Sequence, residues 1–270
     1  MIYQGDISPL HITPTFDHGY LIVWERNTDA DMNLKRIGVY GPGGALAYHA
    51  TIQLPNQKHL RLLNGAADTD DTVAVAFDNP GGFAVLDPSG KQIRTVVTGL
   101  YVPEQICFAP DHTIWVAGQA RPEQDYKIFR KYTPDGQELG EFLPKSTFRP
   151  SLVSVRTVGG RALSASADRI VSLLRSDAPG PAPLEWVELN FDGKLIGRPG
   201  QHRYFFPWAL TPDGTIYARE GGDKFVFFDR AGAGWKPVPV TPQGSLAGAD
   251  RNGLVFQLPN TTTFAWVPLP

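Results

Sequence analysis

The sequence has a single cysteine, Cys107, which excludes an intramolecular disulfide. Cys107 lies in the apolar run ICFA, and this setting favours a buried structural thiol over a nucleophile. No apolar run approaches the length of a membrane span, and the N-terminal segment MIYQGDISPL lacks the basic and apolar regions of a signal peptide. The formal net charge of −2 provides no basic face, so we expect no nucleic-acid partner.

Catalytic motifs are also missing from the chain. GxSxG, HExxH, GxxxxGK[ST] and paired CxxC do not occur, and the six histidines are scattered without metal-ligand spacing. Whether the protein is an enzyme therefore stays open at this level.

Helical periodicity is hard to find, whereas glycine (28 residues) and proline (24 residues) are plentiful. Residues 102–143 read as a complete unit: strand VPEQICFA, turn PD, strand HTIWVAG, loop QARPEQD, strand YKIFRKY, turn TPDG and strand QELGEFL. Four antiparallel strands in about 45 residues form a meander, the unit of a repeat protein.

The turns of this unit recur along the chain in two sets. First turns, between the first and second strands of a unit, are FDHG (16–19), DTDD (68–71), PDH (110–112), SAD (166–168), PDG (212–214) and DRNG (250–253). Second turns, between the third and fourth strands, are GPGG (41–44), DPSG (87–90), TPDG (133–136), FDG (191–193) and DRAG (229–232). Asp accepts turn hydrogen bonds and Gly adopts positive φ, so we expect these turns to be mainly structural.

Six first turns and five second turns predict an all-β fold in which the last unit lacks its fourth strand. The unassigned strand is MIYQGDI (1–7) at the other end of the chain. We therefore predict one domain, residues 1–270: a monomeric six-bladed β-propeller of four-stranded antiparallel blades, closed by pairing of the N-terminal strand with the C-terminal blade. A β-sandwich pair is the alternative.

Blade four is the least regular unit. RPSLVSVRTVGG (149–160) is interpreted as an outer strand or an insertion, and SDAPGPAP (176–183) as a proline-rich loop that extends the blade.

The succession strand–PDG–strand–PDG–strand resembles NHL-repeat propellers and the related senescence-marker/gluconolactonase superfamily of six-bladed propellers. The similarity covers nearly the whole chain but rests on turn residues. It implies the fold, whereas propellers include both enzymes and passive binding modules.

In such a blade, the loops between the second and third strands and between blades share one face, here termed the channel mouth, which is the usual ligand site. The segment HRYFFPW (202–208) falls there. We predict an aromatic and cationic wall formed by Arg203, Tyr204, Phe206 and Trp208, with Arg26, Arg149 and Arg219 donating charge-assisted hydrogen bonds. The alternative is that these aromatic residues fill the gap between blades.

A metal is the second possibility. The gluconolactonase resemblance implies a divalent cation in the channel, and the acidic residues predicted to reach it are Glu25, Asp78, Glu104 and Glu220. Ion pairs with the neighbouring arginines are the alternative. NTDADMN (27–33) has the alternating oxygen ligands of a calcium loop but lacks its glycine and closing Glu, and DTDD (68–71) is a weaker match.

The leading hypothesis is a cofactor-free binding module that recognises a peptide, a glycan or a small anionic ligand at the channel mouth. The alternatives are a hydrolase or lactonase that depends on calcium or another divalent metal, and a structural domain of a larger exported protein. The strand-like N-terminus favours an extracytoplasmic (periplasmic or secreted) protein, with any leader absent from this chain, over a cytoplasmic one.

Overall fold

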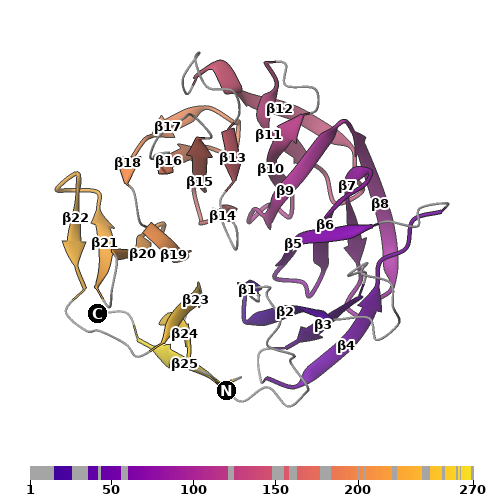
Figure 1. Cartoon of the computed structure of the whole chain (residues 1–270), viewed down its shortest axis with the longest axis horizontal. Helices are drawn as coiled ribbons and strands as arrows, with labels where there is room; N and C mark the ends of the chain where they lie inside the picture. The colour runs from indigo at the N-terminus through magenta and orange to yellow at the C-terminus, as the bar shows by residue number, and fades with distance from the viewer. Residues whose placement is uncertain are drawn as a thin grey trace.

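The computed structural model describes residues 15–25, 36–41, 44–55, 60–120, 125–147, 155–157, 163–176, 184–199, 201–202, 205–220, 224–238, 244–250, 253–259, 261 and 263–268. Within these ranges the one helix is a short 3-10 turn at Lys145–Thr147, and every other regular element is a β-strand. Six antiparallel sheets surround a common centre (Figure 1), so the chain is a six-bladed β-propeller. Nothing among the described residues is a helix of the length and apolarity needed to cross a membrane.

The first three blades are regular four-stranded meanders. Blade 1 consists of β1 (Thr15–Asp17), β2 (Tyr20–Glu25), β3 (Arg36–Tyr40) and β4 (Leu46–Thr51). Blade 2 consists of β5 (Arg61–Ala67), β6 (Val73–Asp78), β7 (Gly81–Leu86) and β8 (Gln92–Gly99). Blade 3 consists of β9 (Tyr101–Phe108), β10 (Ile114–Ala120), β11 (Lys127–Tyr132) and β12 (Glu138–Pro144), the unit that the sequence predicts most clearly.

The last three blades follow the same order with more variation. Blade 4 consists of β13 (Val155–Thr157), β14 (Leu163–Ala165), β15 (Ile170–Ser176), β16 (Leu184–Leu189), β17 (Leu195–Gly197) and β18 (Gln201–His202). Blade 5 consists of β19 (Phe205–Leu210), β20 (Ile216–Glu220), β21 (Phe225–Asp229) and β22 (Gly234–Pro237). Blade 6 has three described strands, β23 (Ser245–Asp250), β24 (Gly253–Gln257) and β25 (Phe264–Val267).

Blade 4 is a four-stranded blade whose first and fourth strands are each divided in two. β13 and β14 both pair with β15, and β17 and β18 both pair with β16. Residues 155–157 therefore belong to the inner strand of the blade. The interpretation of residues 149–160 as an outer strand is wrong for this part of the segment. Of the predicted proline-rich loop, residues 177–183 lie outside the described residues.

The repeated turns share one set of backbone hydrogen bonds. In the second turns of blades 2, 3 and 4, the first residue donates to the fifth and the fourth donates to the first, as in Asp87–Lys91 (2.9 Å) and Gly90–Asp87 (2.8 Å). The fourth residue is Gly90, Gly136 or Gly193, with φ between 78° and 84°. Glycine adopts this left-handed conformation without steric cost, which explains why the pattern recurs in the sequence.

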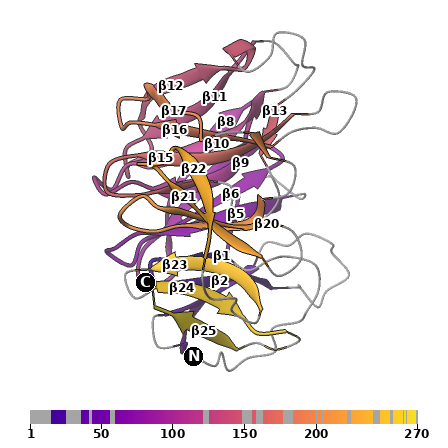
Figure 2. The ribbon, with the colours of Figure 1, turned by 90° about the vertical axis from the view of Figure 1, so that its left-hand side faces the viewer.

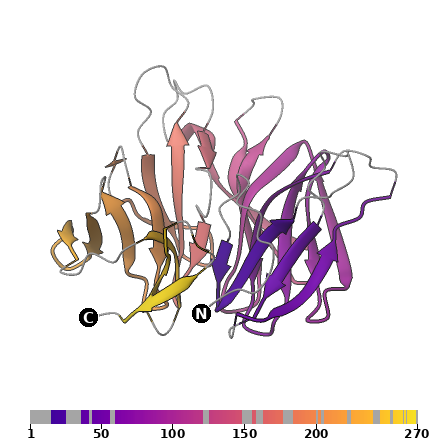
Figure 3. The same ribbon diagram turned by 60° about the horizontal axis from the view of Figure 1, so that its bottom comes forward.

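Neighbouring blades are joined by apolar packing, and among the described residues each of the six junctions has its own buried cluster. The cluster between the last and the first blade contains Val255 and Phe264 of blade 6 with Leu21, Val23 and Tyr40 of blade 1. Figures 2 and 3 accordingly show the yellow strands of blade 6 beside the indigo strands of blade 1. Packing between these blades closes the ring. The predicted pairing of residues 1–7 with blade 6 lies outside the described residues and stays a prediction.

Candidate functional site

A cavity of about 620 Å³ lies among the first turns, where the innermost strands of the blades converge. All six blades contribute to its lining. The walls are largely apolar, with Phe108, Leu210 and Pro212 among the lining residues, and they carry three carboxylates, from Asp17, Asp68 and Asp71. Neither lysine nor arginine occurs among the described residues that line the cavity.

The first turn of blade 1 holds Asp17 at the cavity through contacts with blade 2. His18 and Gly19 have φ values of 47° and 86°, as in a two-residue type I′ turn, so Asp17 lies opposite Tyr20. Asp17 Oδ2 accepts a hydrogen bond from the Ala67 backbone N–H at 3.2 Å, and His18 Nδ1 lies 2.9 Å from the Ala67 carbonyl oxygen. The buried carboxylate is therefore fixed between two blades.

Blade 2 presents its two cavity carboxylates from the turn 68–72. Asp68 is 3% exposed; its Oδ1 accepts a hydrogen bond from the Thr69 backbone N–H at 2.7 Å, and its Oδ2 lies 2.8 Å from His112 Nδ1 on blade 3. This hydrogen bond raises the pKa of His112 above its ordinary value. Asp71 accepts a hydrogen bond from the Tyr20 hydroxyl of blade 1, and burial together with this bond raises the pKa of Tyr20 to about 12.

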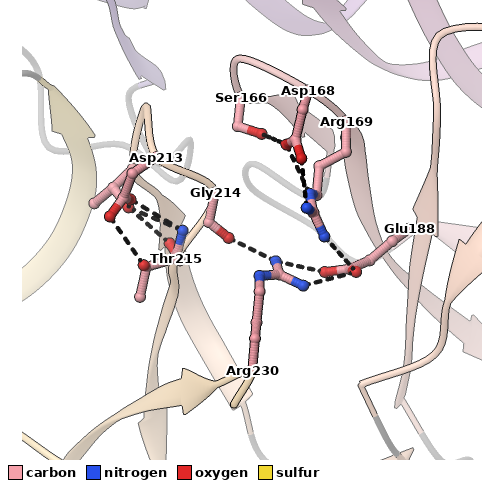
Figure 4. Close-up of polar contacts among 9 residues, drawn as sticks. Ser166, Asp168, Arg169, Glu188, Asp213, Gly214, Thr215 and Arg230 are labelled. Carbon is pink, nitrogen blue, oxygen red and sulfur yellow. Dashed lines mark hydrogen bonds and ion pairs between the residues drawn. The ribbon is translucent and has the colours of Figure 1, made fainter. Parts of the chain in front are cut away.

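Ion pairs fix the wall formed by blades 4 and 5 (Figure 4). Glu188, whose side chain is 4% exposed, contacts Arg169 of its own blade at 3.1 Å and Arg230 of blade 5 at 2.7 Å. Arg230 Nη2 also donates to the Gly214 carbonyl at 2.6 Å. Asp168 accepts hydrogen bonds from Arg169 Nε at 2.8 Å and Ser166 Oγ at 3.2 Å, so the turn that lines the cavity is tied to this network.

The predicted channel-mouth wall is only partly described. Arg203, Tyr204, Arg26 and Arg149 lie outside the described residues. The backbone of Phe206 belongs to β19, but its side chain is not described. Arg219 is half-buried on β20.

Trp208 is part of the core between blades 4 and 5. It is 3% exposed, and its ring meets that of Trp186 edge-on, with centroids 4.8 Å apart. The packing alternative given above accounts for this position. The ligand-binding role of the whole wall stays a prediction.

The four predicted metal ligands are not gathered in the described structure. Glu25 ends β2 and its side chain is not described, while Glu220 is exposed at the end of β20. Asp78 Oδ1 accepts the Asn79 backbone N–H at 2.8 Å. Glu104 Oε1 accepts a hydrogen bond from Gln119 Nε2 at 2.7 Å. The prediction that these residues hold a cation stays a prediction.

Sequence reasoning missed the cavity because it treated the first turns as structural connections. The useful signal is the phase of the repeat. First turns follow the innermost strands and must meet at the centre of the ring, so polar residues such as Asp17, Asp68 and Asp71 in them are brought together. The segment NTDADMN (27–33) lies outside the described residues.

Comparisons with known proteins support the fold. No protein-family model matches the chain, and no curated protein sequence matches it. Similar solved structures include virginiamycin B lyase from Staphylococcus aureus, with a TM-score of 0.53 and 13% identity over 88% of this chain and 73% of that one. A catalytically inactive variant of that lyase with quinupristin gives a TM-score of 0.52 and 14% identity, covering 89% of this chain and 74% of that one.

A nidogen/laminin complex contains a second similar chain. It has a TM-score of 0.50 and 14% identity, and the match covers 88% of this chain and 80% of that one. At these identities the similarity shows the six-bladed propeller fold alone. The fold is thus common to a lyase and to a protein–protein complex, and the function must be argued from the site.

Proposed function

We propose that this protein is a ligand-binding propeller whose cavity among the first turns takes a small molecule with an amino or a hydroxyl group. The observation that carries the proposal is a 620 Å³ cavity with largely apolar walls and three carboxylates. Small-molecule sites commonly have volumes of about 300–1,000 Å³, with apolar walls and a few polar groups that orient the ligand. The cavity has both properties.

The charge of the lining selects among ligands. Asp17 and Asp68 are each 3% exposed, and the described lining residues include no lysine or arginine; the one basic side chain there is His18, whose Nδ1 lies 3.0 Å from Asp17 Oδ1. A carboxylate or phosphate entering this cavity would meet like charges in a medium less polar than water, whereas an ammonium group would be attracted. We therefore expect amines to bind best, alcohols less tightly and acids least.

This site differs from the channel mouth predicted from the sequence, where arginines favour peptides, glycans or small anions. The two faces would recognise opposite charges, so ligand preference distinguishes them. The lyase and the nidogen/laminin chain show that the fold accommodates catalysis and protein binding, and neither supplies a ligand for this chain.

The experiment compares three probes that differ in one group: phenethylamine, phenethyl alcohol and phenylacetate. Each is titrated into the protein while its amide NMR spectrum is recorded. We expect the amine to bind and to perturb the first turns. We expect Asp71→Asn to weaken the binding about tenfold, since a charge-assisted hydrogen bond contributes roughly 1.5–3 kcal/mol. Asn tolerates the φ of 71° at this position and can still accept the hydrogen bond from Tyr20.

A blocking variant gives the control. Ala167 lines the cavity and is exposed, so Ala167→Trp should obstruct the cavity while leaving the core intact. Gln137→Trp places the same ring at an exposed position directly after the second turn of blade 3. Gln137 does not line the cavity, so this variant should leave the affinity unchanged. Equal affinity for the acid and the amine, or an amine affinity that Ala167→Trp does not alter, would refute the proposal.

A further inference from the structure

Asp68, Asp70 and His112 form a second chemical feature at the edge of the cavity. One potential ligand atom from each lies within 4.8 Å of the others, and they are the three side chains of this kind that come together in the described part of the chain. Asp68 and Asp70 belong to the first turn of blade 2, and His112 to that of blade 3. The cluster joins two blades, and only Asp68 is shared with the cavity lining.

The carboxylates are held in place by their own turn. Asp68 Oδ1 accepts the Thr69 backbone N–H at 2.7 Å, which directs Oδ2 to His112 Nδ1 at 2.8 Å. Asp70 Oδ1 accepts the Thr72 backbone N–H at 3.1 Å. One oxygen of each carboxylate is thus held by its own turn, while Asp68 Oδ2 faces His112 and one potential ligand atom of Asp70 lies within 4.8 Å of both.

His112 occupies the fourth position of its first turn, where blade 5 has Gly214 and blade 2 has Asp71, all with positive φ. The first turns of blades 3 and 5 have the same hydrogen bonds: Ala109 N–H to Thr113 and His112 N–H to Ala109 in one, Thr211 N–H to Thr215 and Gly214 N–H to Thr211 in the other. The corresponding φ values are 62° at His112 and 85° at Gly214. The backbone of blade 3 is therefore suited to glycine, and the imidazole is what this chain adds.

We propose that Asp68, Asp70 and His112 bind a zinc-like divalent transition-metal cation between blades 2 and 3, at the rim of the cavity. Two carboxylates and one neutral imidazole balance the charge of the cation, and imidazole favours zinc and its neighbours over calcium or magnesium. Zinc bonds to nitrogen and oxygen are about 2.0–2.2 Å long. Ligand atoms in a tetrahedral site of this size lie about 3.4 Å apart. Asp68 Oδ2 and His112 Nδ1, now 2.8 Å apart, would therefore separate slightly as the cation replaces the hydrogen bond between them. Water would complete the coordination.

The test is calorimetric titration of the full, chelator-treated chain with zinc chloride, alongside calcium chloride and magnesium chloride. We expect one zinc site and no comparable binding of calcium or magnesium. His112→Gly should weaken zinc binding by about tenfold or more, since it removes one of three protein ligands. The variant should fold because its turn adopts the conformation of Gly214.

Two further variants complete the design. Asp70→Asn keeps the hydrogen bond to Thr72 and should also weaken zinc binding. His49→Gln removes an exposed histidine on β4 and should not change it. Absence of zinc binding by the wild type would overturn the proposal. So would binding that survives both His112→Gly and Asp70→Asn, or a preference for calcium. Because phenethylamine binding is measured separately on metal-free protein, this site and the cavity proposal can fail independently.

Discussion

Arg230 in the second turn of blade 5 holds both carboxylate oxygens of Glu188 in blade 4, with Nη1 2.8 Å from Oε2 and Nη2 2.7 Å from Oε1. The planar guanidinium of Arg230 thus contacts both carboxylate oxygens across a blade junction. Arg169 adds a third contact, to Oε2 at 3.1 Å. Because Glu188 is buried, the pair joins the blades in a setting where solvent screening is weak.

Glu188→Gln should lower the free energy of unfolding by about 2–3 kcal/mol. Breaking a buried ion pair costs about 3–5 kcal/mol, and the two arginines are partly exposed, which reduces the cost. The midpoint of urea unfolding measures the effect. Glu141→Gln is the control: Glu141 pairs with Arg130 at 2.6 Å, but its side chain is 39% exposed, so we expect a loss below about 1 kcal/mol. Equal losses in the two variants would contradict this account.

Acid should remove the contribution of the Asp168 carboxylate to the free energy of unfolding. The hydrogen bond from Arg169 lowers the pKa of this carboxyl below its ordinary value. Its contribution to stability is complete above the unfolded-state pKa of about 3.9 and is lost as the pH falls through the lowered native value. The difference in urea midpoint between wild type and Asp168→Asn should thus be present at neutral pH and shrink below about pH 4. A difference independent of pH would rule out the charge as its source.

Alanine substitutions at two glycines with positive φ distinguish the cost of backbone strain from the cost of overpacking. Gly99 has a φ of 67° and open space where a Cβ would lie, so Gly99→Ala should cost about 1 kcal/mol. Gly193 has a φ of 78°, and its Cβ would come within 1.8 Å of Phe142 Cδ1. We expect Gly193→Ala to cost about 1–3 kcal/mol more, as overpacking does. Thermal unfolding of the two variants compares them directly, and similar melting points would contradict the predicted clash.

Trp208→Ala should lower the free energy of unfolding by about 3–5 kcal/mol, since it removes a buried aromatic ring from the junction of blades 4 and 5. Trp235→Ala changes a partly buried ring in the same region and should cost less. Urea unfolding measures both. If Trp208→Ala were as stable as wild type yet lost ligand binding, the channel-mouth role predicted for this ring would be favoured instead.

The fold could be predicted because turn chemistry is local. Gly90, Gly136 and Gly193 each mark a turn whose positive φ favours glycine, and their spacing reveals the blade repeat without any knowledge of tertiary contacts. The blade count follows from this spacing together with the Asp-containing first turns, such as those at residues 68–71 and 110–112. Blade 4 is less predictable because residues 155–157 and 163–165 are two short pieces of one strand position, a division that no turn signal announces.

The candidate site depends on contacts between turns that are distant in sequence. Asp68 and His112 are 44 residues apart along the chain, and they meet because the blades are arranged around a common centre. Likewise, nothing near Trp208 in the sequence says whether its ring faces solvent or Trp186, since both environments suit an aromatic residue. Repeat phase brings such residues into the same region but does not orient their side chains.

The closed series of six apolar junctions has a consequence for cooperativity. In an open repeat array, the end units unfold first because each has a single neighbour. Here blade 6 packs on blade 1, so every blade has two neighbours and no unit is an end. Rupture of any one junction would turn the ring into a linear array with two newly exposed faces. The free-energy costs of substitutions at two different junctions should therefore deviate from a simple sum, even where the residues lie too far apart to touch.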